Sequence, residues 1–157
     1  MQETVFINSP LGITKIVGDE DGVSVISVTA EGEISLRTPS VLSEAVSQLQ
    51  EYFDKKRTHF TFKINPKGTE FQQKVWLELL NIPFGKTISY LDLSKKLGDV
   101  KAIRAAASAN GKNPLWIVVP CHRVIGTNGS LTGYAGGLWR KKWLLEHENP
   151  TNQQTLF

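Results

Sequence analysis

The stretch SYLDLSKKLGDVKAIRAAASANG, residues 89–111, decides the fold of the second half of this chain. It opens with Ser89, a residue suited to cap a helix, and its first helical run ends at Gly98. A second helical run follows over residues 100–111. Two short helices joined by a tight turn that contains glycine are typical of a helix-turn-helix. We therefore expect a small helical domain around this stretch.

Three flanking segments complete that domain. The run TEFQQKVWLELL, residues 69–80, predicts an earlier supporting helix with Thr69 as its cap. Its predicted buried face consists of Phe71, Val75 and Leu79. Residues 116–119 read as a returning strand, and GGLWRKKWLLEHE, residues 136–148, reads as a last amphipathic helix.

The first third of the chain has the pattern of a β-sheet. β-branched runs separated by glycine and acidic turn residues predict an antiparallel meander. Its four expected strands are residues 3–9, 12–18, 22–29 and 33–38. Residues 39–56 carry apolar side chains at helical spacing, and Phe60, Phe62 and Ile64 alternate as a further extended piece. The turn-rich NPKG at 65–68 separates this part from the helical one.

The predicted fold class is therefore α+β with two domains. Residues 1–65 would form an antiparallel sheet with a helix, residues 66–148 the helix-turn-helix domain, and 149–157 a flexible tail. The length of 157 residues suits one ordinary domain or two small ones.

Composition excludes several classes of protein. No signal peptide is recognisable at the N-terminus, and no apolar run approaches the roughly 20 residues that cross a bilayer. The single cysteine can form neither an internal disulfide nor a cysteine-based zinc site. We expect no cofactor or metal, no membrane association, and a cytoplasmic location, or a nuclear one in a eukaryote.

Charge is distributed unevenly along the chain. Residues 1–65 carry 6 Lys and Arg against 9 Asp and Glu, whereas residues 66–148 carry 12 against 6. A basic second domain suggests a polyanionic partner, although a merely solvated surface explains such an imbalance as well.

The helix expected at 100–111 carries mostly small residues. They are Ala102, Ala105, Ala106, Ala107, Ser108 and Ala109. A helix that reads the major groove needs Arg, Asn or Gln at base edges, and here Arg104 stands alone. Two readings are open: a helix packed closely on its neighbours, or a narrow helix pressed into the minor groove with Arg104 entering the base stack. The poverty of base-reading side chains disfavours a helix-turn-helix transcription regulator.

The run WIVVPCHRVIG, residues 116–126, contains the only cysteine, with a histidine beside it. A free thiol has a pKa of ~8.5, and a histidine oriented by a carboxylate is the usual means of lowering that pKa. His122 offers the imidazole and Glu148 the carboxylate. The alternatives are a buried, structural Cys121 and, with less support, a cysteine hydrolase.

These motifs together resemble the O6-alkylguanine-DNA alkyltransferases. The resemblance rests on NPLWIVVPCHRVIG (113–126), GYAGG (133–137) and KKWLLEHE (141–148), and extends upstream through GTEFQQKVW (68–76) and IPFGKTISY (82–90). It implies a ribonuclease-H-like N-terminal domain and a winged-helix-like C-terminal domain that carries the active site. It also implies one irreversible alkyl transfer per molecule, from O6-alkylguanine and conceivably O4-alkylthymine, to the protein's own cysteine.

The resemblance implies roles for individual residues. Cys121 would be the nucleophile and alkyl acceptor, and His122, oriented by Glu148, would be its base through a water. Asn113 would tie the recognition helix to the active-site loop, and Tyr90 would donate a proton to N3 of the leaving guanine.

Further residues would bind the substrate and the DNA. The pocket would be lined by Val124, Tyr134, Ala135 and Trp116. The DNA-binding residues would be Arg104, Ala102, Ala105, Ala106, Ser89, Lys101 and Arg123. Arg104 would fill the hole left by the flipped nucleotide. Some members of that family carry a structural zinc in the N-terminal domain, and we expect no such site here, because residues 1–65 contain no cysteine and only His59.

The expected partner is double-stranded DNA with an alkylated guanine, bound through the minor groove by a monomer. A non-catalytic protein that binds alkyl lesions and signals to other repair factors is the alternative. The end of the chain, QQTLF at Gln153–Phe157, resembles the short peptides by which bacterial repair proteins dock on the sliding clamp. A frayed or packed tail is the alternative reading.

Overall fold

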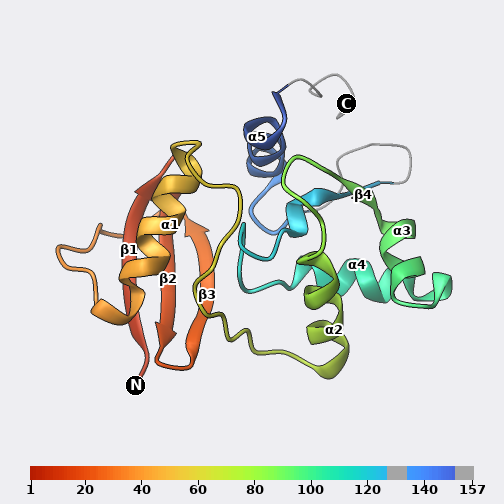
Figure 1. The fold of residues 1–157 in the computed structure, drawn as a ribbon, viewed down its shortest axis with the longest axis horizontal. Helices are drawn as coiled ribbons and strands as arrows, with labels where there is room; N and C mark the ends of the chain where they lie inside the picture. The colour runs from red at the N-terminus through yellow and green to blue at the C-terminus, as the bar shows by residue number, and fades with distance from the viewer. Residues whose placement is uncertain (127–133, 151–157) are drawn as a thin grey trace. The chain divides into compact units, whose positions relative to one another are not determined.

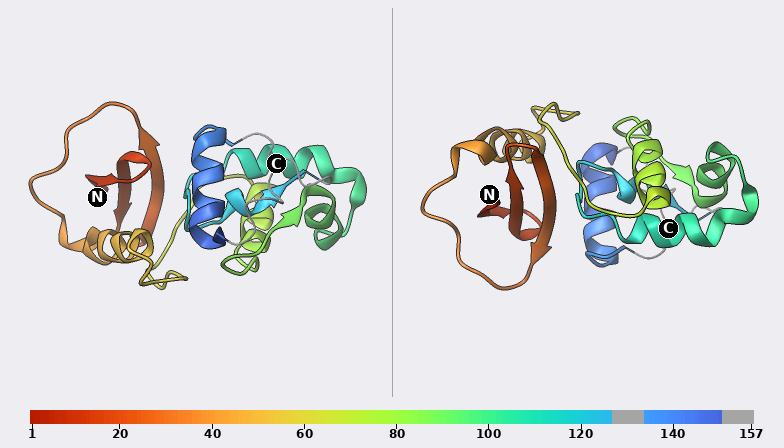
Figure 2. Two further views of the ribbon diagram at one scale, coloured as in Figure 1. Left: turned by 90° about the horizontal axis from the view of Figure 1, so that it is seen from above. Right: turned by 90° about the horizontal axis from the view of Figure 1, so that it is seen from below.

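The computed structural model describes residues 1–126 and 134–150, which fall into two compact units (Figure 1). The first unit comprises Met1–Lys67 and Pro114–Val118. The second comprises Gly68–Asn113 and the described residues from Val119 onward. Two further views show a sheet with its helix in the first unit and a group of helices in the second (Figure 2). The mixed fold class is the one predicted from the sequence.

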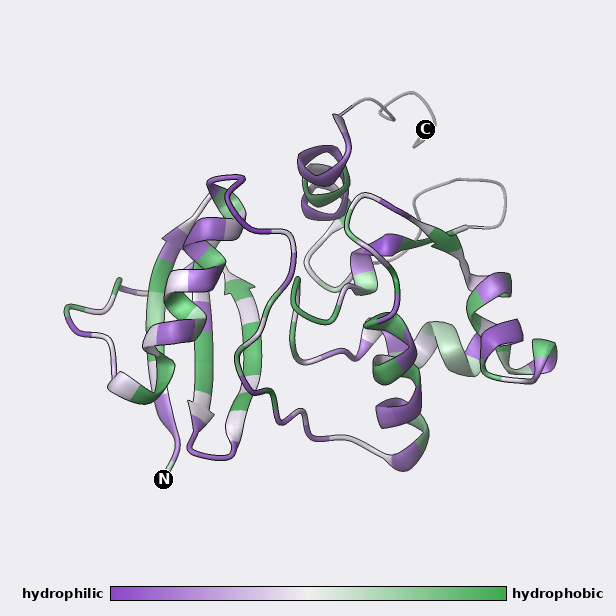
Figure 3. Cartoon of the chain, in the orientation of Figure 1, coloured by the Kyte–Doolittle hydropathy of each residue, from purple (hydrophilic) through white to green (hydrophobic). Residues whose placement is uncertain are grey.

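The first unit is built on a three-stranded antiparallel sheet. Its strands are β1 (Glu3–Ser9), β2 (Gly12–Asp19) and β3 (Gly22–Thr29), in the order β1-β2-β3. Val5 pairs with Ile16, and Ile16 pairs with Ile26, so that three fully buried side chains form a row across the sheet. Figure 3 shows hydrophobic residues on all three strands. Tight turns and the alternation of buried and less buried side chains therefore form an antiparallel meander, as the sequence predicts.

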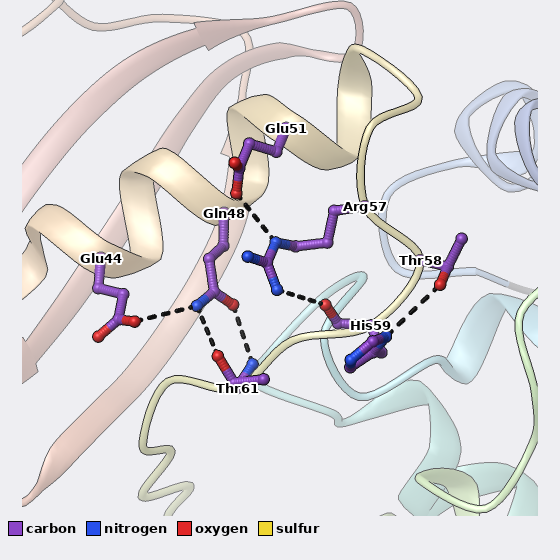
Figure 4. Close-up of polar contacts among 7 residues, drawn as sticks. All are labelled: Glu44, Gln48, Glu51, Arg57, Thr58, His59 and Thr61. Carbon is purple, nitrogen blue, oxygen red and sulfur yellow. Dashed lines mark hydrogen bonds and ion pairs between the residues drawn. The ribbon is translucent and has the colours of Figure 1, made fainter.

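One helix accompanies the sheet. A short 3-10 turn η1 (Ser40–Leu42) leads into α1 (Ser43–Phe53), as the apolar spacing predicted. Gln48 is buried on α1 and binds the backbone N–H and the hydroxyl of Thr61 at 2.9 and 2.8 Å (Figure 4). The guanidinium of Arg57 bonds Glu51 at 3.0 Å. These contacts fix residues 57–61 along the helix.

The predicted fourth strand, residues 33–38, is wrong. Phe6 donates its backbone N–H to the Ser35 hydroxyl at 2.9 Å, in the place where a strand would offer a carbonyl. Ser35 returns one bond to the Phe6 carbonyl, and Leu36 is fully exposed. The expected extended piece at 60–64 is reduced to a single bridge between Ile64 and Val23.

The predicted strand at 116–119 is also wrong. Leu115 makes one bridge to Ile26, after which the Val118 N–H bonds the Trp116 carbonyl at 2.8 Å. Ile117, at the centre of that three-residue turn, has a φ of 75°. Positive φ is rare for a β-branched residue, so the backbone leaves the extended conformation here despite its strand-like composition.

The second unit contains the predicted helix-turn-helix. Its helices are α2 (Glu70–Leu79), α3 (Tyr90–Lys96), α4 (Ile103–Gly111), which follows the 3-10 turn η2 (Val100–Ala102), and α5 (Leu138–Glu148). A short parallel pair joins β4 (Ile88–Ser89) to β5 (Val124–Ile125), directly after the 3-10 turn η3 (Cys121–Arg123).

Helix starts in this unit follow from their caps. Thr69 forms a capping box with Gln72, and Ser89 accepts the Asp92 N–H at 3.0 Å. The face of α2 differs from expectation, since Phe71 is 36% exposed and Trp76 is 2% exposed. The Trp76 indole N–H bonds the Ala109 carbonyl at 2.9 Å, which ties α2 to α4.

None of the helices within residues 1–126 and 134–150 combines the length and the apolar character that crossing a bilayer requires.

Candidate active site

Cys121 lies at the first position of η3, directly after a tight turn. Pro120 has φ −81° and ψ 63°, and the Cys121 N–H bonds the Val119 carbonyl at 2.8 Å. This is an inverse γ-turn, a conformation common where a chain changes direction. Cys121 is 4% exposed. The proline that follows the apolar run therefore turns the chain and carries the cysteine into the interior.

Behind the cysteine lies a buried histidine–carboxylate pair. His122 Nε2 is 2.8 Å from Glu148 Oε2, and both side chains are almost fully buried. Glu148 is the last residue of α5, so the tertiary fold brings together residues that are 26 positions apart. The second ring nitrogen, Nδ1, is buried and has no hydrogen-bonding partner among the described residues. One side of the imidazole is thus fixed, and the other is available to a proton donor.

Arg123 holds the same carboxylate from the other side. Its Nε donates to Glu148 Oε1 at 2.8 Å and its Nη2 to Oε2 at 2.9 Å, a bidentate pair. Its Nη1 donates to the Ile82 carbonyl at 2.7 Å. These donors are used within the protein and the residue is 6% exposed, and the contact of Arg123 with DNA stays a prediction.

Two asparagines connect α4 to the cysteine turn. Asn113 donates to the Val119 carbonyl at 2.7 Å, and its side chain also hydrogen-bonds the Cys121 thiol. Asn110, which sequence reasoning missed, donates to the Cys121 carbonyl at 3.4 Å. Its position one helical turn before Asn113, in ANGKN, is the signal that could have revealed it.

The thiol does not have the lowered pKa that the sequence suggested. Burial raises the pKa of Cys121 to about 11, while Asn113 and the charge of Lys141 act in the opposite direction. Removing the thiol from water disfavours the thiolate, and the neighbouring groups compensate only in part. Cys121 is therefore protonated at neutral pH in this state of the protein.

The pKa values of His122 and Glu148 are both lowered. Burial lowers the pKa of His122, and this outweighs the opposing effect of Glu148. Burial alone would raise the pKa of Glu148, but His122 and Arg123 hold it well below its usual range. A neutral imidazole beside an ionised carboxylate is the arrangement that can accept a proton.

Lys141 is a further charged residue at the site, and sequence reasoning missed it. It is 0% exposed, and its Nζ lies 5.8 Å from the centroid of the Tyr90 ring. Burial lowers the pKa of Lys141 to about 8, against the effect of Cys121. It shares the buried face of α5 with Leu144, Leu145 and Glu148. A lysine within an apolar helical stripe was the available signal.

The predicted pocket residues lie in different places. Tyr134 is largely buried just before α5, and burial raises the pKa of its phenol well above the usual value. Ala135 is exposed, and the Val124 side chain is fully buried, which leaves its backbone as the group that can bind a ligand. Trp116 belongs to the first unit, where its backbone N–H donates to the Ile26 carbonyl at 3.0 Å.

Some of the predicted DNA-binding residues are exposed, and others are half-buried or buried. Lys101, Arg104 and Ala105 are exposed on η2 and α4, whereas Ala102 and Ser89 are half-buried. The contact of Ala106 with DNA stays a prediction, and in this structure Ala106 is 0% exposed. It faces the interior because a residue two positions after Arg104 lies on another side of the helix.

No cluster of three or more His, Cys, Asp or Glu side chains within the described part of the chain is arranged to hold a metal ion.

The second unit thus combines a helix-turn-helix with a buried thiol and a histidine–carboxylate pair. Two family models match this chain. The ribonuclease-like domain of 6-O-methylguanine DNA methyltransferase matches residues 4–66, and the DNA-binding domain of the same family matches residues 70–150. The chain belongs to the 6-O-methylguanine DNA methyltransferase family.

Individual relatives agree with this assignment. The methylated-DNA–protein-cysteine methyltransferase of Methanosarcina acetivorans is 43% identical over 147 residues, which cover 89% of this chain and 94% of the relative. The crystal structure of Mycobacterium tuberculosis O6-methylguanine methyltransferase matches with a TM-score of 0.86 and 41% identity, covering 96% of this chain and 94% of the other. The M. tuberculosis protein in complex with DNA matches with a TM-score of 0.83 and 40% identity, over 96% and 92% of the two chains.

Proposed function

We propose that this protein repairs alkylated DNA by direct reversal, transferring the alkyl group of O6-alkylguanine to Cys121 once per molecule. The observation that carries the proposal is the buried series Cys121, His122 and Glu148 on a helix-turn-helix unit, with 2.8 Å between His122 and Glu148. Relatives named methylated-DNA–protein-cysteine methyltransferase support it.

DNA binding comes first in the proposed mechanism. The target carbon lies inside the duplex, so the nucleotide must rotate out, which costs a few kcal/mol and least for a damaged pair. The exposed face of α4, with Arg104 and Ala105, enters the minor groove, and Arg104 takes the place of the flipped nucleotide. The structure of the M. tuberculosis relative in complex with DNA supports the proposal that this chain binds DNA.

The next step is proton transfer from the Cys121 thiol, followed by alkyl transfer. The thiol is protonated at rest, so it must lose its proton as the substrate fills the pocket. Neutral His122 takes that proton through a water at Nδ1, while Glu148 stabilises the imidazolium that forms. An S–C bond then forms as the C–O6 bond breaks, and the electron pair remains on guanine.

The leaving guanine completes the step. It takes a proton at N3 from Tyr90, and the main-chain carbonyls of Cys121 and Val124 hold its exocyclic amine. Asn113 joins α4 to the cysteine turn, and Tyr134 and Ala135 line the pocket. The resulting thioether is not hydrolysed, so the protein is consumed by one reaction.

Intact mass spectrometry after incubation with a duplex that contains O6-methylguanine tests the proposal. We expect one methyl group per molecule on Cys121, located by peptide mapping, with unmodified guanine restored and no gain in Cys121→Ser. Binding to the lesion without any gain in mass would contradict the proposal and leave a lesion-binding protein without chemistry.

The remaining parts of the proposal concern partners and location. We take the protein to be a cytoplasmic monomer, or a nuclear one in a eukaryotic source. The clamp-docking peptide Gln153–Phe157 lies outside the described residues and rests on its sequence. Titration of the tail peptide against purified sliding clamp tests it, and lack of binding at high micromolar concentrations would remove it.

A further inference from the structure

Arg123 is a buried cation to which the proposed mechanism gives no role. Its side chain is 8% exposed, and arginine is almost never buried in this way unless it is paired. Three N–H groups of the guanidinium are donated inside the second unit. Nε and Nη2 bond the two oxygens of Glu148 at 2.8 and 2.9 Å, and Nη1 bonds the Ile82 carbonyl at 2.7 Å. The side chain is therefore arranged to bind groups of the protein itself.

The guanidinium joins the end of α5 to the loop that follows α2. Its Cζ lies 5.8 Å from the centre of the Phe84 ring in that loop. Asn149, directly after Glu148, donates its side-chain N–H to the Gly85 carbonyl at 3.0 Å, and Figure 1 shows the loop beside α5. An arginine that turned toward DNA would leave the Glu148 carboxylate buried without its cation. Breaking a buried ion pair in this way is strongly destabilising.

Holding the carboxylate also determines which nitrogen of His122 carries a proton. The last torsion of a glutamate side chain is broad, so a single hydrogen bond from the imidazole leaves the carboxylate plane free to rotate. A planar guanidinium that bonds both oxygens fixes that plane, and Oε2 then faces Nε2 of the imidazole at 2.8 Å. An ionised carboxylate only accepts hydrogen bonds, so Nε2 carries the proton and the lone pair lies on Nδ1. Nδ1 is the atom that takes the thiol proton in the proposed mechanism.

We propose that Arg123 is a positioning residue for alkyl transfer, which acts through Glu148 and His122 rather than on DNA. This role rests on the function proposed above. Arg123 exchanges no proton: the thiol proton passes through a water to Nδ1 of His122, and the electron pair of the breaking C–O6 bond stays on guanine. The arginine keeps the carboxylate in the orientation that leaves Nδ1 ready to accept that proton.

Two substrates separate a positioning role from a DNA contact. At saturating duplex that contains O6-methylguanine, Arg123→Met should transfer the methyl group about 10- to 100-fold more slowly, since a displacement of ~1 Å can cost that much. The loss should be equally large on free O6-methylguanine base. The Kd for the duplex, measured in the unreactive Cys121→Ser background, should be unchanged. Arg123→Lys keeps the charge without the bidentate geometry, so its rate should lie between those of Arg123→Met and the wild type.

A double-mutant cycle tests whether the arginine acts through the carboxylate. Arg123→Met should cause no further loss of rate in the Glu148→Gln background, because the group that it positions is already absent. The double variant removes both charges of the buried pair, so it should unfold at a higher urea concentration than either single variant. A merely structural arginine would instead give a rate that recovers together with stability. Arg57→Met, which removes the Arg57–Glu51 pair of the first unit, is the matched control and should change neither rate nor Kd.

Weaker binding of the duplex together with a normal rate on the free base would overturn the proposal and establish Arg123 as a DNA contact. Losses that multiply in the cycle would overturn it as well, because the arginine would then act independently of Glu148. If Arg123→Met fails to fold, Arg123→Lys, alone and combined with Glu148→Gln, gives the same comparison.

A measurement without DNA separates this proposal from the proposed function. Nitrogen-15 NMR of histidine-labelled protein at pH 7 shows which ring nitrogens are protonated, and a His122→Gln spectrum identifies the signals of His122 among the three histidines. We expect a proton on Nε2 alone in the wild type and a proton on Nδ1 in Arg123→Met. Identical His122 signals in the two proteins would refute the positioning role. The expected signals without methyl transfer by the wild type would contradict the proposed function alone.

Discussion

At the scale of single residues, Glu148 connects the chemistry of the site with the stability of the fold. Its two oxygens accept bonds from His122 at 2.8 Å and from Arg123 at 2.8 and 2.9 Å. All three side chains are buried, so the loss of one leaves the others with unsatisfied groups. A carboxylate at the end of a helix thereby fixes the ring that is to accept the thiol proton.

We expect Glu148→Gln to slow methyl transfer by ~10²- to 10⁴-fold, the range that general-base catalysis contributes. The variant should also lose roughly 3–5 kcal/mol of unfolding free energy, because Arg123 stays buried without its anion. Single-turnover rates on lesion-containing duplex and urea unfolding measure the two effects. Glu146→Gln, a more exposed position on the same helix, is the control. An unchanged transfer rate in Glu148→Gln would remove the carboxylate from the mechanism.

Arg104 is exposed on α4, so its replacement should affect DNA and leave the fold intact. We expect Arg104→Ala to slow transfer from duplex DNA by about 10- to 100-fold, since the cost of base flipping is then no longer offset. Transfer from free O6-methylguanine base should be unchanged. The ratio of the two rates is the measurement, with Lys112→Ala beyond the same helix as the control. Equal losses on both substrates would show that the arginine acts on the chemistry rather than on the DNA.

At the scale of elements, the ends of the helices are fixed by short polar side chains. Thr69 and Ser89 cap α2 and α3, and each accepts an N–H that the helix cannot satisfy itself. Trp76 on α2 then bonds α4 at Ala109. Capping therefore matters beyond α2, because α2 supports the helix that is proposed to bind DNA.

The capping box of α2 gives a stability prediction. Thr69→Ala removes the acceptor of the Gln72 N–H at 3.1 Å and should cost about 1 kcal/mol of unfolding free energy. The midpoint of urea unfolding at constant slope measures it. Thr58→Ala, an exposed threonine outside any helix, should change stability by much less. Equal effects of the two substitutions would argue against a specific role of the cap.

At the scale of the whole molecule, the buried ionisable groups determine how stability depends on pH. Glu148 has a lowered pKa in the folded state, so its stabilising contribution is present above its unfolded pKa of about 4.3 and is lost as pH falls below that value. His122 also has a lowered pKa, so the unfolded chain binds a proton below about pH 6.5 that the folded protein resists. Both effects have the same sign.

We therefore expect the unfolding free energy to decrease continuously from pH 7 to pH 3. The decrease should be clearly smaller in Glu148→Gln, which lacks the titrating carboxylate. Urea unfolding at pH 7, 5 and 3.5 measures it. At alkaline pH the raised pKa of Cys121 and the lowered pKa of Lys141 act in opposite directions, so the dependence there should be weak. Stability that increases on acidification would contradict these assignments.

Much of this protein was determined by local sequence. Turn glycines and alternating β-branched residues gave three strands, caps and apolar spacing gave the helices, and the motif around PCHRV indicated the family. The recognisable motifs PCHRV and LLEHE also predict Cys121, His122 and Glu148 as site residues.

Other features depended on distant contacts. Residues 33–38 and 116–119 have strand-like composition, yet the Ser35 hydroxyl and the turn at Ile117 prevent a ladder. The sequence predicts Arg123 as a DNA ligand, and only the fold brings in its carboxylate and carbonyl partners, 25 and 41 residues away. Burial of Cys121 raises the pKa of the thiol, which is the opposite of the shift that the sequence suggested. The local sequence pattern determines which helices and strands form. The partner of a charged side chain and its access to water depend instead on the residues that the fold packs against it.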